Sequence, residues 1–176
     1  MTPSIRIRPA RMEDALPLLA IYRPYVEDTV VSFEVAPPTL EEFTARIQKA
    51  LAKWAWLVAE EDGQCVGYAY GSMHRERAAY RYSTEVSAYV AASARRRGIG
   101  ALLYRELFTA LAARGYCNAL AGVALPNAAS VALHESVGFT AVGVFRNIGW
   151  KFGSWHDVAW FEKQLRDSPT SFSKQG

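Results

Sequence analysis

Apolar side chains recur along this chain with the two spacings that distinguish helices from strands. Alternating apolar and basic residues at positions 5–8 predict a short strand, and helical spacing of apolar residues within positions 15–22 predicts a helix after it. Thr39 and Glu42 form a capping box, which is typical of a helix start. We therefore expect one strand followed by two helices at the beginning of the chain.

Strand-like runs at residues 56–60 and 65–71 flank Asp62 and Gly63, a dipeptide typical of a tight turn between antiparallel strands. This pattern predicts a β-hairpin in the middle of the N-terminal half.

Residues 85–90 predict a further strand that carries polar side chains on one side. A period of two places Glu85, Ser87 and Tyr89 on one face and small apolar residues on the other. A basic, glycine-containing turn at residues 95–100 follows, and it leads into a clear apolar stripe at helical spacing.

The rest of the chain predicts a buried strand at residues 119–125 and a short helix capped by Asn127. Two more strands follow, around residues 140–145 and 156–165. Strands and helices mixed in this order predict an α/β fold built on one sheet.

Composition limits the class of protein. The 176 residues fit one domain, which we assign to residues 1–166, with a loose polar tail at residues 167–176. A net charge of +3 is too weak to indicate a nucleic-acid partner. No signal peptide and no membrane-spanning run is evident, so we expect no membrane association. The two cysteines, Cys65 and Cys117, argue against a disulfide framework and favour a cytoplasmic location.

The turn at residues 95–100 reads R-x-x-G-x-G and opens a helix. The first N–H groups of a helix lack intrahelical partners and carry the positive end of its dipole, which suits a phosphate. Gly98 and Gly100 allow the backbone to approach an anion closely. The G-K-[ST] of a Walker loop and the third glycine of a dinucleotide fingerprint are absent. Taken alone, the turn fits a phosphate site and a solvated basic turn equally well.

The segment V-x(4)-R-x-x-G-x-G-x-x-L, at residues 90–103, resembles the acetyl-CoA pyrophosphate motif of the GNAT acetyltransferases. L-P-N at residues 125–127 and L-H-E-S-V-G-F at residues 133–139 follow at the spacing of that family. The resemblance implies a mixed, mostly antiparallel, twisted sheet flanked by helices, with a V-shaped splay between two central strands. It also implies acetyl-CoA as co-substrate. The residues that it assigns to acetyl-CoA are Tyr89, Val90, Arg95, Arg96, Arg97, Gly98, Ile99, Gly100, Ala101, Asn127 and Ser130.

Within that superfamily the chain resembles the phosphinothricin acetyltransferases, through T-V-V-S-F, R-x-R-x-x-Y, T-E-V-S-A-Y-V and G-W-K-F-G-S-W-H-D-V. This implies transfer of an acetyl group to the amine of a small amino-acid-like molecule such as phosphinothricin, methionine sulfoximine or methionine sulfone. The chain departs from the usual residues at Arg75, Ser87 and Ser154. The acceptor-site candidates are Phe33, Arg75, Arg77, Tyr80 and Ser87. If the segment holding the two arginines is extended, both point the same way and could bind a charged head group; otherwise they belong to a solvated loop.

The reaction needs a base for the acceptor amine, and the resemblance assigns this role to Glu85. It assigns His134 to proton transfer, either as the acid for the departing thiolate or as a partner in the base role. It places an oxyanion donor at a main-chain N–H near Tyr89 or Val90. Read without the family, Glu85 fits a solvated strand residue and His134 an ordinary half-buried histidine.

The three histidines, His74, His134 and His156, are too dispersed to indicate a metal site. The resemblance implies a homodimer. Two other functions stay open: an acetyltransferase for a different small amine or a peptide N-terminus, and a non-catalytic acetyl-CoA-binding module.

Overall fold

The computed structural model describes residues 4–169. Its strands are β1 (Arg6–Pro9), β2 (Trp56–Glu61), β3 (Gln64–Met73), β4 (Ser83–Val90), β5 (Asn118–Ala124), β6 (Thr140–Lys151) and β7 (Ser154–Gln164). Its α-helices are α1 (Ala15–Glu27), α2 (Leu40–Lys53), α3 (Ile99–Ala113) and α4 (Ala128–Ser136). Short 3-10 turns lie at Met12–Asp14, Ala78–Tyr80 and Ala92–Ala94.

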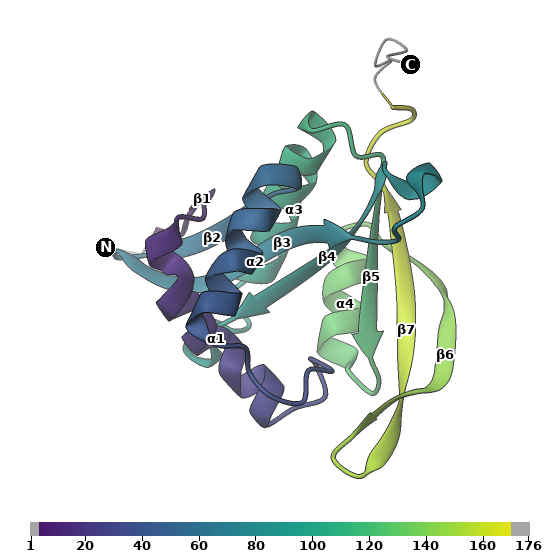
Figure 1. The fold of residues 1–176 in the computed structure, drawn as a ribbon, viewed down its shortest axis with the longest axis horizontal. Coiled ribbons are helices and arrows are strands. Elements are labelled where there is room, and N and C mark those ends of the chain that lie inside the picture. The colour runs from purple at the N-terminus through teal and green to yellow at the C-terminus, as the bar shows by residue number, and fades with distance from the viewer. Residues whose placement is uncertain (1–3, 170–176) are drawn as a thin grey trace.

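In this part of the chain the strands form one sheet in the order β1-β2-β3-β4-β5-β7-β6. Neighbours are antiparallel except for β4 and β5, which are parallel. Helices α1 and α2 cover one face of the sheet, and α3 and α4 lie on the other (Figure 1). The predicted α/β fold with a mixed, mostly antiparallel sheet is confirmed.

Each helix layer buries a different kind of core. Rings of Phe43, Trp56 and Tyr68 pack edge-to-face or stacked beneath α1 and α2, with centroids 5.2–6.1 Å apart. On the other side, Leu103, Leu107 and other apolar residues of α3 are fully buried. Burial of each such side chain contributes roughly 1.5–3 kcal/mol. The central strands are therefore packed on both faces.

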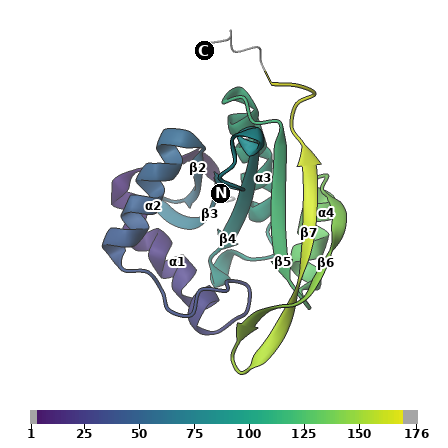
Figure 2. The ribbon, with the colours of Figure 1, turned by 45° about the vertical axis from the view of Figure 1, so that its right-hand side comes forward.

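The predicted splay lies between β4 and β5. Their pairing covers only residues 83–85 of β4 against residues 118–120 of β5, although both strands continue further. Figure 2 shows the two strands separating toward the end of β4. There the hydroxyl of Tyr25 takes the place of a neighbouring strand: it donates to the Val90 carbonyl at 2.6 Å and accepts from the Val90 N–H at 3.3 Å.

Local signals in the sequence are confirmed where they rest on backbone chemistry. The Thr39 hydroxyl accepts from the Glu42 N–H, and the Glu42 carboxylate accepts from the Thr39 N–H, which is the predicted capping box. Asp62 and Gly63 form the hairpin turn with φ of 49° and 79°. Strand β6 is longer than predicted: it continues past residue 145, through a bulge, to Lys151. Asn147 sits in the bulge at a φ of 48°, and its N–H donates to Asp157.

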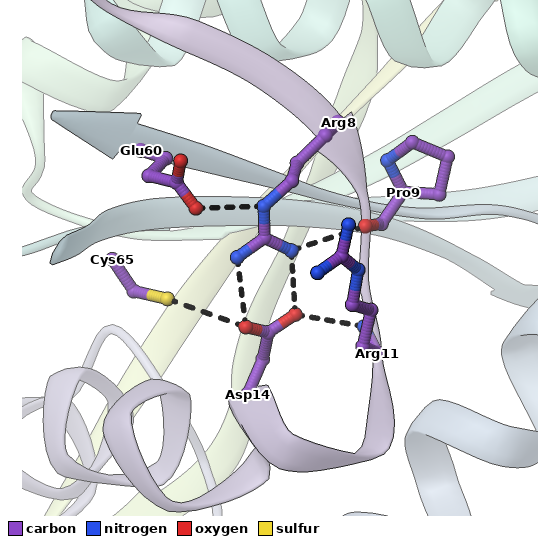
Figure 3. A network of polar contacts seen from close by, with 6 residues as sticks. All are labelled: Arg8, Pro9, Arg11, Asp14, Glu60 and Cys65. Atoms are coloured by element: carbon purple, nitrogen blue, oxygen red, sulfur yellow. Dashed lines mark hydrogen bonds and ion pairs between the residues drawn. The ribbon is translucent and has the colours of Figure 1, made fainter. Parts of the chain in front are cut away.

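A partly buried arginine ties the first strand to its neighbours (Figure 3). The Arg8 guanidinium donates two hydrogen bonds to Asp14, at 2.7 and 2.9 Å, and one to Glu60 at 2.8 Å. This pairing lowers the pKa of Asp14 below its usual value, against the opposing effect of burial. The network joins β1, the turn before α1 and β2.

Residues that precede the predicted tail still contact the domain: the Leu165 N–H and the Arg166 guanidinium donate to carbonyls of Cys117 and Ala112. Most of the predicted tail, residues 170–176, lies outside the described residues. None of the helices within residues 4–169 is long and apolar enough to cross a bilayer.

Candidate active site

A cleft of about 510 Å³ opens where β4 leaves β5, within the roughly 300–1,000 Å³ typical of ligand sites. It lies between the end of β4, the basic turn, the start of α4 and α1. Its lining residues are Tyr25, Val31, Ala88, Val90, Ala94, Arg95, Arg96, Gly98, Ile99, Gly100, Ala101, Asn127, Ala129, Ser130 and Leu133. Nine of the eleven residues predicted for acetyl-CoA are in this set, all but Tyr89 and Arg97.

The basic turn lines the cleft and leads into a helix start that has no side-chain cap. Arg96 and Gly98 have φ of 61° and 76°, and Gly98 caps α3 without a side chain that could accept from the helix start. The N–H groups of the first helical turn are therefore available to an anion. Gly100 serves packing instead, since a Cβ there would lie 3.0 Å from Leu133 of α4.

The three arginines of the turn have different surroundings. The guanidinium of Arg95 lies over the ring of Tyr25, 4.9 Å from its centroid. Arg96 is exposed and lines the cleft. Arg97 instead forms a two-pronged ion pair with Glu61 at the end of β2, and this pairing lowers the pKa of Glu61. The sequence could not predict this pairing, because Glu61 comes from a distant hairpin.

Asn127 positions the start of α4 as expected. Its side-chain oxygen accepts from the Ser130 N–H at 3.1 Å, and both residues line the cleft. Tyr89, by contrast, turns its ring into the core, with ring centroids of Tyr22, Tyr25 and Tyr68 within 4.9–5.4 Å. Any contact of Tyr89 with a ligand would therefore involve its main chain.

Glu85 lies at the vertex of the splay, as the last residue of β4 that pairs with β5. Its side chain is 35% exposed, and its Oε1 is 2.9 Å from Nδ1 of His74. His74 follows β3 directly and contacts the rings of Tyr80 and Trp160. No pattern in the sequence predicts that this histidine pairs with Glu85.

His134 is 4% exposed, and both of its ring nitrogens are bound by protein groups. Its Nδ1 is 2.7 Å from the Ser130 carbonyl, which accepts, so this nitrogen carries a proton. Its Nε2 is 3.1 Å from the Tyr104 hydroxyl. Burial lowers the pKa of His134, and the bond to Ser130 opposes this effect only in part. These surroundings therefore favour the neutral form of the imidazole.

The two residues predicted for proton transfer lie on opposite faces of the sheet. His134 stacks on Phe161 of β7. Through the strand pairing, Phe161 lies on the same face of the sheet as Ala121 and Thr84, and this is the face that α3 covers. Glu85, next to Thr84 in β4, points to the other face. The structure therefore does not bring these two side chains together.

The acceptor-site candidates are more scattered than the acetyl-CoA set. The ring of Phe33 packs on Gly149, where an added Cβ would lie 2.2 Å from it, and it faces His156. Ser87 is half-buried on the same face of β4 as Glu85. Tyr80 is 43% exposed beside His74.

The condition attached to the paired arginines is not met. Arg75 and Arg77 are exposed, and the chain bends at residues 74, 76 and 77 rather than continuing β3. The alternation that would point both side chains the same way belongs to an extended strand, so it does not apply here.

A buried cation that the sequence did not reveal anchors the loop that carries Phe33. Lys151, at the end of β6, donates to the carbonyls of Val26, Thr29 and Ser32 at 2.6–2.8 Å. It joins the β6–β7 hairpin to the loop after α1 that carries Phe33, two segments that lie side by side in Figure 2. Among residues 4–169 no group of three His, Cys, Asp or Glu side chains could hold a metal ion.

A sheet opened at parallel central strands, with a helix start offering free N–H groups beside the opening, defines the class of acetyl-CoA-dependent acetyltransferases. Residues 7–160 match the family model described as an acetyltransferase (GNAT) domain, and the chain belongs to this family.

Three relatives narrow the comparison. The chain is 40% identical to a phosphinothricin N-acetyltransferase of Streptomyces coelicolor, over 93% of this chain and 98% of that one. It is 32% identical to a methionine sulfoximine/methionine sulfone acetyltransferase of Pseudomonas paraeruginosa, over 92% and 95%. Its fold is similar to that of a Sinorhizobium meliloti phosphinothricin acetyltransferase in complex with acetyl-CoA, with a TM-score of 0.91, 32% identity and coverage of 99% and 97%.

Proposed function

We propose that this N-acetyltransferase moves the acetyl group of acetyl-CoA onto the amino group of a small amino-acid-like molecule. The observation that carries this proposal is the cleft, in which nine residues predicted for acetyl-CoA meet at the opening of the sheet. The relatives named for phosphinothricin and for methionine sulfoximine or sulfone support this acceptor class.

In the proposed mechanism the diphosphate of acetyl-CoA binds the N–H groups at the start of α3, and the pantetheine arm enters the splay. Glu85 takes a proton from the acceptor ammonium, which frees the nitrogen lone pair to attack the thioester carbonyl. Such base catalysis typically contributes roughly 10²–10⁴-fold. The Val90 N–H, which now makes only a 3.3 Å contact with Tyr25, is the proposed donor to the tetrahedral oxyanion. Collapse of the tetrahedral intermediate breaks the C–S bond, and the nitrogen gives up its second proton to form the amide. A proton passes to the departing sulfur, so that CoA leaves as the thiol, all in one ternary complex.

His134 stays in the proposal only as the acid for the thiolate. Its lowered pKa and its single ring proton mean that it would have to gain a second proton first. His134→Asn tests this role. A fall of kcat to less than roughly one tenth of the wild-type value, with acetyl-CoA affinity unchanged, would support it. A fall in kcat that is accompanied by a lower Tm would instead assign His134 to packing among Tyr104 and Phe161.

An acceptor panel assayed for CoA release tests the function itself. It contains phosphinothricin, methionine sulfoximine, methionine sulfone, glutamate and a peptide with a free alanine N-terminus. We expect turnover with at least one of the first three. Turnover with the peptide alone would favour a peptide acetyltransferase, and CoA binding without any turnover would favour a non-catalytic module.

We also propose that the chain works in the cytoplasm as a homodimer. Both cysteines are free thiols, which suits a reducing compartment. Large apolar side chains are at least half exposed along the C-terminal hairpin, at Val142, Val144, Phe145, Ile148, Trp150, Phe152 and Trp155. Such a surface suits contact with a second copy. Light scattering at assay concentration tests this, and a monomeric mass would contradict it.

A further inference from the structure

The residue that holds the proposed base is His74. Its Nδ1 lies 2.9 Å from Oε1 of Glu85, and its side chain is only 13% exposed. The histidine is fixed from two further directions, by edge-on contacts with Tyr80 and Trp160 at centroid distances of 5.6 and 6.2 Å. An exposed glutamate on a strand would otherwise sample several rotamers.

The chemistry of the pair fixes which atom donates. An ionised carboxylate only accepts hydrogen bonds, so the short contact requires a proton on Nδ1 of His74. This bond occupies Oε1 of Glu85, whereas Oε2 has no hydrogen-bond partner among the described residues. The arrangement therefore orients one carboxylate oxygen and leaves the other to meet the acceptor amine.

We propose that His74 is a positioning residue for this reaction: its Nδ1–H locks the Glu85 carboxylate at the splay vertex in the orientation that accepts the amine proton. This inference rests on the proposed role of Glu85. His74 acts through Glu85 and does not itself touch the acceptor. Because a misplaced catalytic group loses much of its effect, we expect loss of this bond to lower kcat by roughly 10- to 100-fold.

Two substitutions separate hydrogen bonding from packing. His74→Asn keeps an N–H donor attached at Cγ, close to the place of Nδ1, but it removes the ring. His74→Phe keeps a ring between Tyr80 and Trp160 but removes the donor. We expect His74→Asn to retain kcat within about threefold of wild type and His74→Phe to lose roughly 10- to 100-fold. The KM for acetyl-CoA should stay unchanged in both variants, because His74 does not line the cleft.

If His74→Phe keeps the wild-type kcat, or if His74→Asn loses as much as His74→Phe, the positioning role is refuted. Thermal unfolding and calorimetric CoA binding establish that each variant is folded. Should His74→Phe fail to fold, His74→Leu replaces it, because it also removes the donor and keeps an apolar side chain between Tyr80 and Trp160.

Glu85→Gln keeps the two failures apart. If this variant turns over at the wild-type rate, the proposed base role falls, and the inference falls with it. If Glu85→Gln is impaired and His74→Phe is not, only the inference falls. In the Glu85→Gln background, His74→Phe should add less than about a twofold loss, because residues acting as a unit are not additive.

Discussion

Replacing Lys151 with methionine should strongly destabilise the domain, because this side chain fills a buried position with three hydrogen bonds. Lys151 is 4% exposed, and the carbonyls of Val26 and Ser32 that it binds are buried, while that of Thr29 is partly buried. Methionine has a similar length and fills the same space without a donor. Burial already lowers the pKa of Lys151, so removing the charge also relieves a desolvation cost.

The expected size follows from the acceptors that lose their donor. Each buried carbonyl left unsatisfied costs roughly 1–3 kcal/mol, so the two buried ones together cost about 4 kcal/mol. Relief of the desolvation cost offsets roughly 1 kcal/mol, which leaves a loss of about 3 kcal/mol in the free energy of unfolding. For a domain of this size that corresponds to a fall in Tm of about 6–12 °C.

Differential scanning calorimetry at pH 7 measures this change. Lys49→Met is the matched control, because Lys49 is exposed on α2, and its substitution should change stability by less than about 0.5 kcal/mol. The reasoning would be refuted if Lys151→Met melted within about 2 °C of wild type. The same variant should raise the acceptor KM more than the acetyl-CoA KM, since the loop released by the substitution carries Phe33.

Three further predictions concern charge and close packing. Asp14→Asn should make the free energy of unfolding depend less on pH in the acid range. The lowered pKa of Asp14 contributes stability that is complete above its unfolded value of 3.8 and is lost as pH falls through the folded value. Urea unfolding at pH 7 and pH 3 measures the difference. Arg96→Met should weaken CoA binding roughly tenfold by calorimetry, whereas Arg97→Met should change it less than about twofold; a reversed order would contradict the assignment of the cleft. Gly100→Val should weaken CoA binding more than tenfold, because even its Cβ would press on Leu133 at 3.0 Å and narrow the cleft; an unchanged Kd would contradict this.

What the sequence could predict is what neighbouring residues decide among themselves. The box of Thr39 and Glu42, the turn at Asp62 and the open helix start at Gly98 each depend on a few adjacent positions. The resemblance to the acetyltransferase family then predicted the opening of the sheet, which depends on strands that are distant in the chain.

The contacts that sequence reasoning missed join positions far apart in the chain. Lys151 binds carbonyls that lie 119–125 positions away in the chain, and Tyr25 binds Val90 at a separation of 65 positions. No local sequence pattern can predict such contacts. The contact between His74 and Glu85 spans only 11 positions, yet it depends on how the bend after β3 returns the chain to β4. The bulge in β6 breaks the alternation by which strand lengths are recognised.

The three hydrogen bonds that Lys151 donates have a consequence for engineering this enzyme. They connect a hairpin near the C-terminus with a loop near the N-terminus, so both ends of the polypeptide shape the region around Phe33. A chimera that borrows only one of these segments from a relative would place a foreign hairpin against a native loop. Grafting a new acceptor preference therefore calls for exchanging the two segments as a matched set.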